Sequence, residues 1–333
     1  MVGLGHLLVD VSAELLQDAR HFYAVRPAGR GPRTAEKLSA ARSARIAPAP
    51  SDPPADECAV RVGGVTVPIR IFTPAHNRAR GVYMDIHGGG FYMDCAARDD
   101  VRNRALADAL NIAVVSVDYR LAPEHPWPAA PSDCEAVARW LIAHAQDRFG
   151  SPQLVIGGRS AGATLATTTL LRLRDTGHAQ RVAGAALQFG TFDLSALTPA
   201  GRRIADEYFL EAYVGHVTDR TDPDISPVYG DLDRLPPVLM VVGAQDVLLE
   251  DNLAMASRLW AAGNDVEIRI YPESPHGFTG HSTEIAQLAL DGISSWVLDR
   301  IDSPTVGRCL PLIRAKPAAA SGDSSVENSV LYW

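Results

Sequence analysis

Apolar runs of strand length alternate with helix-length segments along most of this 333-residue chain. Short apolar runs bounded by turn residues are typical of buried strands, and the longer segments between them have helical spacing. Strands that alternate with helices form βαβ units, which build a mostly parallel sheet with helices on both faces. The pattern therefore predicts an α/β fold whose binding site lies beyond the carboxyl ends of the strands.

The expected strands begin with a hairpin. Cys58–Val62 and Val67–Phe72 flank Gly63-Gly64, a pair that favours a tight turn. Further strands are expected at Val82–Ile86, Ile112–Val117, Leu154–Ile156, Val182–Phe189, Val238–Val242 and Val266–Tyr271. Helices are expected at Val101–Leu110, Ser132–Ala145, Ala161–Leu173, Asn252–Ala262 and Thr283–Leu298.

Both ends of the chain and one internal segment fall outside the alternation. Residues 1–45 are expected to be helical and Pro48–Pro54 is a proline-rich linker, so we predict an N-terminal helical cap segment over residues 1–50. The α/β domain then spans residues 51–301, and Leu197–Thr221 within it has the length of an inserted helical cap. Residues 302–333 are short of apolar side chains and rich in Ser, Ala and Pro, which predicts a disordered tail.

Composition excludes several classes of protein. The 39 acidic and 31 basic side chains give a net charge of −8, which argues against a nucleic-acid partner. No stretch approaches about 18 uninterrupted apolar residues, so no membrane span is expected. The apolar run Val2–Val11 lacks the flanks of a signal peptide, and we expect a cytoplasmic protein. The four cysteines are far apart and indicate neither a disulfide framework nor a zinc site: Cys58, Cys95, Cys134 and Cys309.

The segment Gly158-Arg159-Ser160-Ala161-Gly162 matches the pattern GxSxG between an expected strand and an expected helix. In that context the pattern predicts a nucleophile elbow, a sharp turn that leaves no room for side chains beside the serine. The elbow would place the Ser160 hydroxyl at a helix N-terminus, whose partial positive charge favours a developing anion. Taken alone, the motif is also compatible with a plain glycine-rich turn.

The segment His87-Gly88-Gly89-Gly90 directly follows an expected strand. Glycine lets backbone N–H groups turn toward a substrate oxygen without obstruction by a side chain. We therefore predict an oxyanion hole made of two N–H groups from Gly88, Gly89 and Gly90, together with the N–H of Ala161. A phosphate-binding loop is less favoured, because no Walker lysine follows.

Two further residues complete a candidate catalytic triad. Asp246 and His276 each follow a different expected strand, so both should reach the edge of the sheet where Ser160 lies. The order Ser160, Asp246, His276 is the one found in α/β-hydrolases, in which the histidine takes the serine proton and the aspartate orients the imidazole. Rival acids are Glu250 and Asp251, at or inside the following helix. The histidines nearest to the motifs, His125 and His281, are interpreted as structural or solvent-exposed.

With these motifs the chain resembles the hormone-sensitive-lipase-like group of α/β-hydrolases. The resemblance rests on the HGGG loop, the GxSAG elbow, the stretch Tyr119–Ala130, Asp246-x-Leu248 and His276-Gly277-Phe278, all in the expected order. It implies an eight-stranded sheet with a helical cap and the hydrolysis of short-chain carboxylic esters, and it allows a homodimer. We expect a serine esterase with a small-molecule ester substrate and with no cofactor or metal. The Tyr119–Ala130 stretch is expected to brace the active-site loops.

Two departures from the group's pattern stand out. Arg159 precedes the serine where the group usually carries aspartate, which is either a tolerated change that pairs with Glu124 or another carboxylate, or the mark of a pocket for acidic substrates. Asp94-Cys95 stands where the group often carries glycine, so the resemblance does not determine the shape of the acyl or alcohol pocket.

Three other functions are compatible with the same residues to different degrees. Amide or N-acetyl hydrolysis needs the same catalytic parts as ester hydrolysis. A non-catalytic small-molecule receptor is disfavoured by the presence of His276. A long-chain lipase is disfavoured by the charged side chains of the expected cap: Arg202, Arg203, Asp206 and Glu207.

Overall fold

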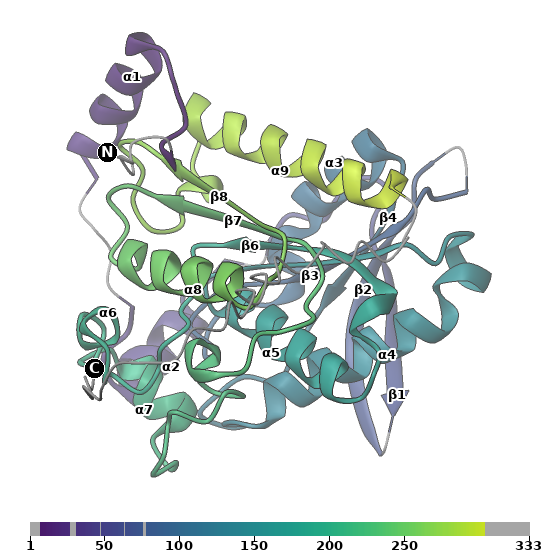
Figure 1. Ribbon diagram of the computed structural model, residues 1–333, viewed down its shortest axis with the longest axis horizontal. Helices are drawn as coiled ribbons and strands as arrows, with labels where there is room; N and C mark the ends of the chain where they lie inside the picture. The colour runs from purple at the N-terminus through teal and green to yellow at the C-terminus, as the bar shows by residue number, and fades with distance from the viewer. Residues whose placement is uncertain (1–6, 27–30, 47, 63, 76–77, 304–333) are drawn as a thin grey trace, which may run out of the picture.

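A computed structural model describes residues 7–26, 31–46, 48–62, 64–75 and 78–303. A twisted eight-stranded sheet forms its centre, in the order β1-β2-β4-β3-β5-β6-β7-β8, and helices cover both faces (Figure 1). The strands are β1 (Asp56–Val62), β2 (Val65–Phe72), β3 (Val82–Ile86), β4 (Ala113–Val117), β5 (Leu154–Arg159), β6 (Val182–Gln188), β7 (Val238–Gly243) and β8 (Val266–Tyr271). All eight expected strands are present, which confirms the predicted α/β architecture.

The directions of the strands bring the carboxyl ends of the parallel strands together on one side of the sheet, where a site can form. β2 runs antiparallel to both of its neighbours, β1 and β4, whereas the strands from β4 to β8 are all parallel. The carboxyl ends of these parallel strands therefore meet at the same edge. The register of β3 with β5 aligns Ile86 with Gly158, so the chain that follows β3 leaves the sheet beside the chain that follows β5.

Helices cover the two faces of the sheet in two groups. On one face lie α3 (Asp100–Leu110) and α9 (Glu284–Asp302), and on the other lie α4 (Ala129–Phe149), α5 (Ala161–Asp175) and α8 (Leu249–Ala261) (Figure 1). Each face has its own hydrophobic core, and successive strand residues alternate between them: Val155 belongs to the core with α9, and Ile156 to the core with α5. Burial on both faces explains why the central strands are mostly apolar.

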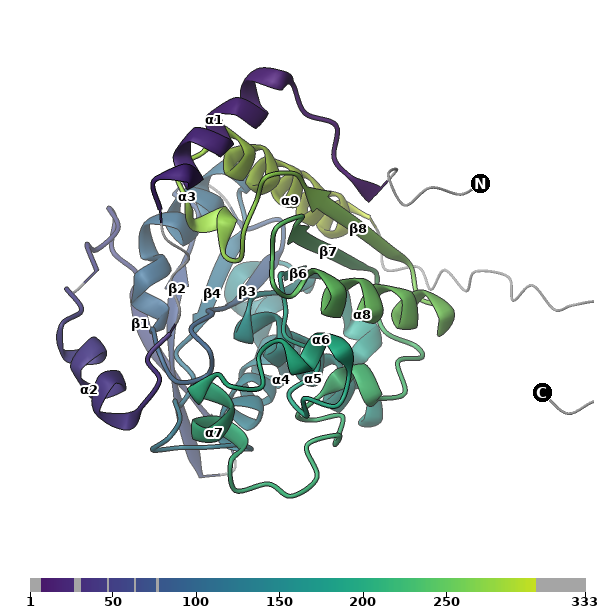
Figure 2. The same cartoon turned by 90° about the vertical axis from the view of Figure 1, so that its left-hand side faces the viewer.

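The prediction of helix over residues 1–45 is wrong just before the first helix. Leu8 forms a parallel bridge with Ile270 of the edge strand β8, and the Val9 N–H donates to the Ile270 carbonyl at 2.9 Å. An edge strand presents unpaired backbone groups, and this segment satisfies one of them. The helices that follow are α1 (Ala13–Ala24), which packs on α9, and α2 (Ala35–Ser43), which lies well away from α1 (Figure 2).

The insertion predicted over Leu197–Thr221 contains two short helices, α6 (Pro199–Arg202) and α7 (Tyr208–Val214), and is otherwise made of turns. At the other end of the chain α9 continues to Asp302, the first residue of the predicted tail. The remainder of that tail from residue 304 on lies outside the described residues. The shorter elements are the 3-10 turns η2 (Ala96–Asp99), η3 (Ala179–Arg181), η4 (Pro227–Tyr229) and η5 (Phe278–Gly280).

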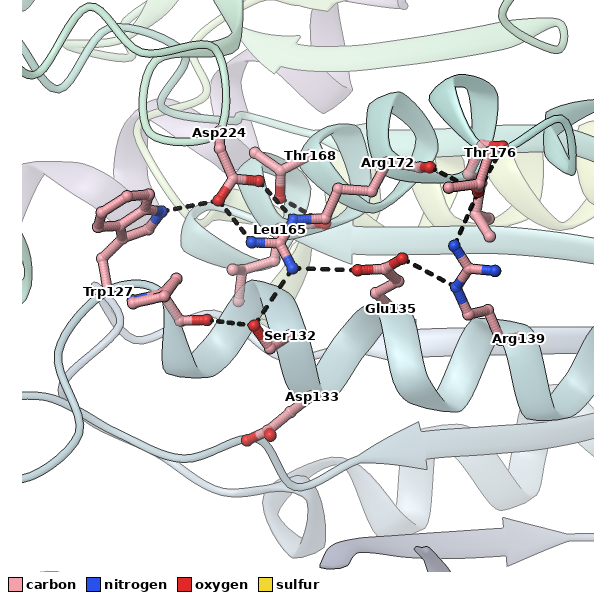
Figure 3. Close-up of polar contacts among 12 residues, drawn as sticks. Trp127, Ser132, Asp133, Glu135, Arg139, Leu165, Thr168, Arg172, Thr176 and Asp224 are labelled. Atoms are coloured by element: carbon pink, nitrogen blue, oxygen red, sulfur yellow. Dashed lines mark hydrogen bonds and ion pairs between the residues drawn. The ribbon is translucent and has the colours of Figure 1, made fainter. Parts of the chain in front are cut away.

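A polar network anchors the chain where it returns from the insertion (Figure 3). Arg172 on α5 forms a two-pronged ion pair with Asp224, with both N–O distances 2.6 Å. Asp224 also accepts a hydrogen bond from the Trp127 indole at 2.8 Å, and the Arg172 guanidinium reaches Ser132 and Glu135 on α4. The end of the insertion is thereby attached to α4 and α5.

None of the helices within the described ranges is long and apolar enough to cross a membrane.

Candidate active site

Ser160 lies in the turn between β5 and α5, with a backbone φ of 52° and ψ of −121°. A positive φ is strained for a residue with a side chain and persists only where the surroundings hold it. Here the Ser160 N–H donates to the Gln188 carbonyl on β6 at 2.9 Å, and the Ser160 carbonyl accepts from the Ala163 N–H at 2.9 Å. The turn is thus held from both sides by backbone groups.

The glycines beside Ser160 are required by close backbone approach. A Cβ atom at Gly158 would overlap the carbonyl group of Gly162, and a Cβ atom at Gly162 would overlap the Ile86 carbonyl at the end of β3. Neither neighbour is a flexible side chain that could move aside. The sharp turn expected from the GxSxG pattern is therefore present, and it also touches the strand that leads into the HGGG loop.

The His276 imidazole reaches the Ser160 side chain. The His276 Nε2 atom lies 3.0 Å from the Ser160 Oγ atom, within hydrogen-bond distance. His276 follows β8, and its side chain is 37% exposed at the floor of a cavity. The edge of the Phe189 ring packs against the imidazole, with ring centroids 5.2 Å apart, and limits its rotation.

The Asp246 carboxylate lies behind the imidazole and is fully shielded from solvent. Its two oxygens are 3.0 and 3.1 Å from the His276 Nδ1 atom, and one of them also accepts from the Leu248 N–H at 2.8 Å. A buried carboxylate beside Nδ1 favours the tautomer with the proton on Nδ1. The Nε2 atom is then the acceptor for the Ser160 hydroxyl.

The loops that carry Asp246 and His276 are tied together by their backbones. The Ala244 N–H donates to the Tyr271 carbonyl at 2.8 Å, and the Gln245 N–H donates to the Ser274 carbonyl at 3.0 Å. These bonds continue the pairing of β7 with β8 beyond the strands. The distance between the carboxylate and the imidazole is therefore set by the sheet.

The rival acids lie elsewhere. The Asp251 carboxylate is buried and accepts from the backbone N–H groups of Phe192 and Asp193 at 2.5 and 3.3 Å. Its burial outweighs these two bonds and raises the pKa of Asp251 to about 7. Glu250 is half-exposed and lies 3.9 Å from Arg203. Neither carboxylate is bonded to His276.

The loop Gly88-Gly89-Gly90 lines the same cavity as Ser160 and Ala161. Behind the loop, the Tyr119 hydroxyl lies 3.0 Å from the His87 carbonyl oxygen and 3.2 Å from that of Gly88. In a trans peptide the C=O and N–H groups point in opposite directions. Because both carbonyls face Tyr119, the N–H groups of Gly88 and Gly89 point away from it. The Ala161 N–H is the first of α5 and has no partner within the helix.

Two residues from the predicted cap segments hold this loop from outside, and the sequence analysis singled out neither of them. The Arg42 guanidinium on α2 donates to the Tyr92 carbonyl and to the Ala122 carbonyl, each at 2.6 Å. On the other side, the Phe91 ring stacks on the Tyr213 ring of α7 at a centroid distance of 4.0 Å. The loop was found from its glycines, whereas no motif marks Arg42 or Tyr213.

The cavity above Ser160 has a volume of about 1490 Å³ and is lined by both apolar and charged side chains. The apolar ones include Phe189, Ile204, Phe209, Val247, Leu248 and Pro275. The charged ones are Arg26, Arg45, Asp94, Arg98, Asp99, Arg159, Arg203 and Glu207. His281 also lines the cavity and lies 3.0 Å from the Tyr23 hydroxyl, a placement that the sequence analysis did not foresee.

Both departures from the family pattern have a structural reason. Asp94 has a φ of 76°, a conformation that favours glycine, and its carboxylate pairs with Arg45 and with Arg98. These ion pairs stabilise the strained residue. Arg159 pairs with Asp99, whereas Glu124, its suggested partner, pairs with Arg42 at 2.6 Å.

In the described part of the chain, no group of three or more His, Cys, Asp or Glu side chains could hold a metal ion.

Comparison with known proteins identifies the family of the chain. A family described as having the α/β-hydrolase fold matches residues 83–280, more than half of the chain. The chain belongs to the α/β-hydrolase family. It is 32% identical to carboxylesterase NlhH of Mycobacterium tuberculosis over 70% of this chain and 78% of that protein. It is 30% identical to ethyl acetate hydrolase of Pseudomonas putida over 65% of this chain and 72% of that protein.

A solved structure places the chain more closely within the family. A hormone-sensitive lipase from a metagenome library superposes with a TM-score of 0.67 at 30% identity, covering 86% of this chain and 97% of that protein. The resemblance to the hormone-sensitive-lipase-like group is confirmed, as is the α/β-hydrolase fold.

Proposed function

We propose that this α/β-hydrolase is a serine esterase that cleaves carboxylic esters of small molecules through an acyl-enzyme intermediate. The observation that carries the proposal is the unbroken path from the Asp246 carboxylate through His276 to the Ser160 hydroxyl, with each contact close to 3.0 Å. A serine hydroxyl is a weak nucleophile until a base accepts its proton, and this path supplies the base and its orientation.

In the first half of the reaction the Ser160 Oγ atom attacks the ester carbonyl carbon while His276 Nε2 takes the hydroxyl proton. The Asp246 carboxylate stabilises the imidazolium that forms. The tetrahedral intermediate then collapses: the bond to the alcohol oxygen breaks, and the imidazolium gives its proton to that oxygen. The acyl group remains on Ser160 as an ester.

In the second half a water molecule attacks the acyl carbon and gives its proton to His276. Collapse of the second tetrahedral intermediate releases the acid, and the same proton returns to Ser160. In both halves the developing negative charge on the carbonyl oxygen would be stabilised by the N–H groups of Gly88, Gly89 and Ala161, with Gly90 allowing the turn of the loop. These groups need no rearrangement when the charge forms.

The acyl chain is proposed to be short. The name of the ethyl acetate hydrolase relative supports a small acyl group, and the charged side chains that line the cavity make poor contact with a long alkyl chain. Amide or N-acetyl hydrolysis uses the same residues and is separated from ester hydrolysis by assay. A cytoplasmic location and a homodimer stay predictions from the sequence.

The decisive experiment compares wild type with Ser160→Ala on p-nitrophenyl esters of increasing acyl length and on one matched amide. We expect Ser160→Ala to lower kcat by about 10³-fold or more and to abolish labelling by a fluorophosphonate. Ser295→Ala, at an exposed position of α9, is the matched control and should behave as wild type.

Each other outcome has a defined meaning. Wild-type protein that neither hydrolyses an ester nor reacts with the fluorophosphonate would lack an activated serine, which would refute the esterase proposal and favour the receptor alternative. A maximum above about ten acyl carbons would overturn the short-chain proposal in favour of a lipase, and a faster amide reaction would make the protein an amidase.

A further inference from the structure

Arg159 occupies an unusual place beside the nucleophile. It is the last residue of β5 and directly precedes the strained Ser160 turn. Its side chain is only 18% exposed, and its guanidinium forms an ion pair with the Asp99 carboxylate, whose side chain is 11% exposed. Ion pairs at an exposed surface contribute little, but removing one partner of a pair withdrawn from water leaves an uncompensated charge.

The Arg159–Asp99 ion pair is part of a longer network of charged side chains that extends into the interior of the protein. Asp99 ends η2 at the start of α3, and Arg102 of α3 lies 3.9 Å from it. Arg102 also pairs at 2.9 Å with Asp85, a buried residue of β3 that accepts a further bond from Asn103 at 3.0 Å. Charges of alternating sign therefore connect the elbow to α3 and to the strand that leads into the oxyanion loop.

The charge on Arg159 is already compensated where it lines the cavity. Burial acts to raise the pKa of Asp99, but the guanidinium groups of Arg102 and Arg159 outweigh it and hold that pKa below its usual value. Asp99 is therefore ionised at neutral pH. Because Asp99 already neutralises the charge of Arg159, a substrate carboxylate would gain less from this guanidinium, which disfavours the alternative of a pocket selective for acidic substrates.

We propose that the Arg159–Asp99 ion pair is a positioning device that holds the Ser160 turn against the start of α3, and that Arg159 takes no part in recognising the substrate. The inference rests on the proposed esterase function, because it assigns a role in setting the nucleophile. A shift of the turn by a fraction of an ångström would move the Oγ atom relative to His276 and to the oxyanion donors, so the pair should influence kcat.

The test is a double-mutant cycle with Arg159→Gln, Asp99→Asn and the double variant, assayed on a neutral p-nitrophenyl ester and on an anionic hemiester of equal acyl length. We expect each single variant to lower kcat about 10-fold on both esters with little change in KM. The kcat of the double variant should be no lower than that of the less active single variant, because the two side chains act as a unit.

Charge reversal gives a second test of the same pair. Arg159→Asp places two carboxylates together and should lower kcat about 100-fold, more than the loss expected for Arg159→Gln. Arg234→Asp is the matched control: it makes the same charge change in an ion pair with Asp233, at a side chain that is 77% exposed, and should leave kcat unchanged.

Fluorophosphonate titration and the thermal midpoint Tm separate loss of folded protein from misplacement of the serine. The proposal requires full titration of each single variant at a slower labelling rate. It is overturned by unchanged kcat in the single variants, by additive losses in the double variant, or by a rise in KM confined to the anionic ester. Unlabelled and inactive wild type would instead refute the esterase function, and this inference would fall with it.

Discussion

The two sides of the cavity are built differently. On one side, the elbow and the loops of Asp246 and His276 are short segments that each follow a strand, and backbone hydrogen bonds fix their relative positions. On the other side, the glycine loop that follows β3, the proposed oxyanion loop, is held by side chains from segments far away in the sequence, Arg42 of α2 and Tyr213 of α7. We infer that changes on the elbow side should lower kcat with little change in KM. Changes on the cap side should lower stability and raise KM, and should affect kcat to a smaller extent through the loop that the cap holds.

The position of the cap residues is stabilised by hydrogen bonds and an ion pair that lie away from the cavity. The Trp127 N–H donates to the Tyr213 carbonyl at 3.0 Å, and the Trp127 indole donates to Asp224, which is paired with Arg172 (Figure 3). The position of Tyr213, and through it of Phe91, is thus coupled to an ion pair on α5. The difference between the two sides can be tested by substitution, beginning with the largest expected effect.

On the elbow side, His276→Ala removes the proposed base and should lower kcat by about 10³-fold or more, with little change in KM. The measurement is steady-state hydrolysis of a short p-nitrophenyl ester. His144→Ala, at an exposed position of α4, is the matched control. Near-normal kcat in His276→Ala would remove this histidine from the mechanism.

Gly162→Ala tests whether backbone approach fixes the elbow. The added Cβ atom would overlap the carbonyl oxygens of Ile86 and His87, and overpacking of this kind costs about 1–3 kcal/mol. Because the strain falls between the elbow and the oxyanion loop, we expect kcat to fall about 10- to 100-fold. Unchanged kcat and unchanged Tm would show that the elbow can accommodate a Cβ atom at position 162, and would contradict this prediction.

On the cap side, Asp224→Asn removes the charge that pairs with Arg172. We expect a loss of about 1–3 kcal/mol in the free energy of unfolding and a Tm lower by about 2–8 °C. KM for the ester should rise more than kcat falls, since Tyr213 and the cavity wall shift while the elbow stays in place. Asp291→Asn, at an exposed position of α9, is the control. An effect confined to kcat would contradict the division between the two sides.

Asp251 joins the two sides, because it lies on α8 after the Asp246 loop and binds the backbone that leads into the insertion. Its pKa is about 7 in the folded protein and about 4 in an unfolded chain. The neutral carboxyl group therefore stabilises the fold fully below about pH 4, and this stability is lost as the pH rises through 7. The Tm of Asp251→Asn relative to wild type should increase by about 2–4 °C between pH 5 and pH 8. A constant difference would refute the raised pKa.

Local patterns in the sequence were sufficient to predict the strands and the glycine-rich turns, because the conformation of these elements depends mainly on residues that are close together in the chain. The apolar runs predicted the central strands β3 to β7, because a strand buried on both faces must be largely apolar. The pair Gly63-Gly64 predicted the hairpin of β1 and β2. The GxSxG and HGGG segments predicted the elbow and the loop, since only glycine fits where backbones approach closely. Asp246 and His276 followed from their places after parallel strands, whose carboxyl ends meet at one edge.

Other features are set by contacts between segments that are distant in the chain, and no local pattern encodes them. The residues before α1 have apolar character that fits a helix as well as a strand, and only the open edge of β8 decides that Leu8 pairs with Ile270. Arg159 could have paired with several carboxylates, and the packing of α3 beside β5 selects Asp99. The sequence alone determined the chemistry available at the edge of the sheet, because motifs specify backbone geometry. The tertiary structure decided which charges meet and what lines the cavity, because side-chain partners are chosen by proximity in space.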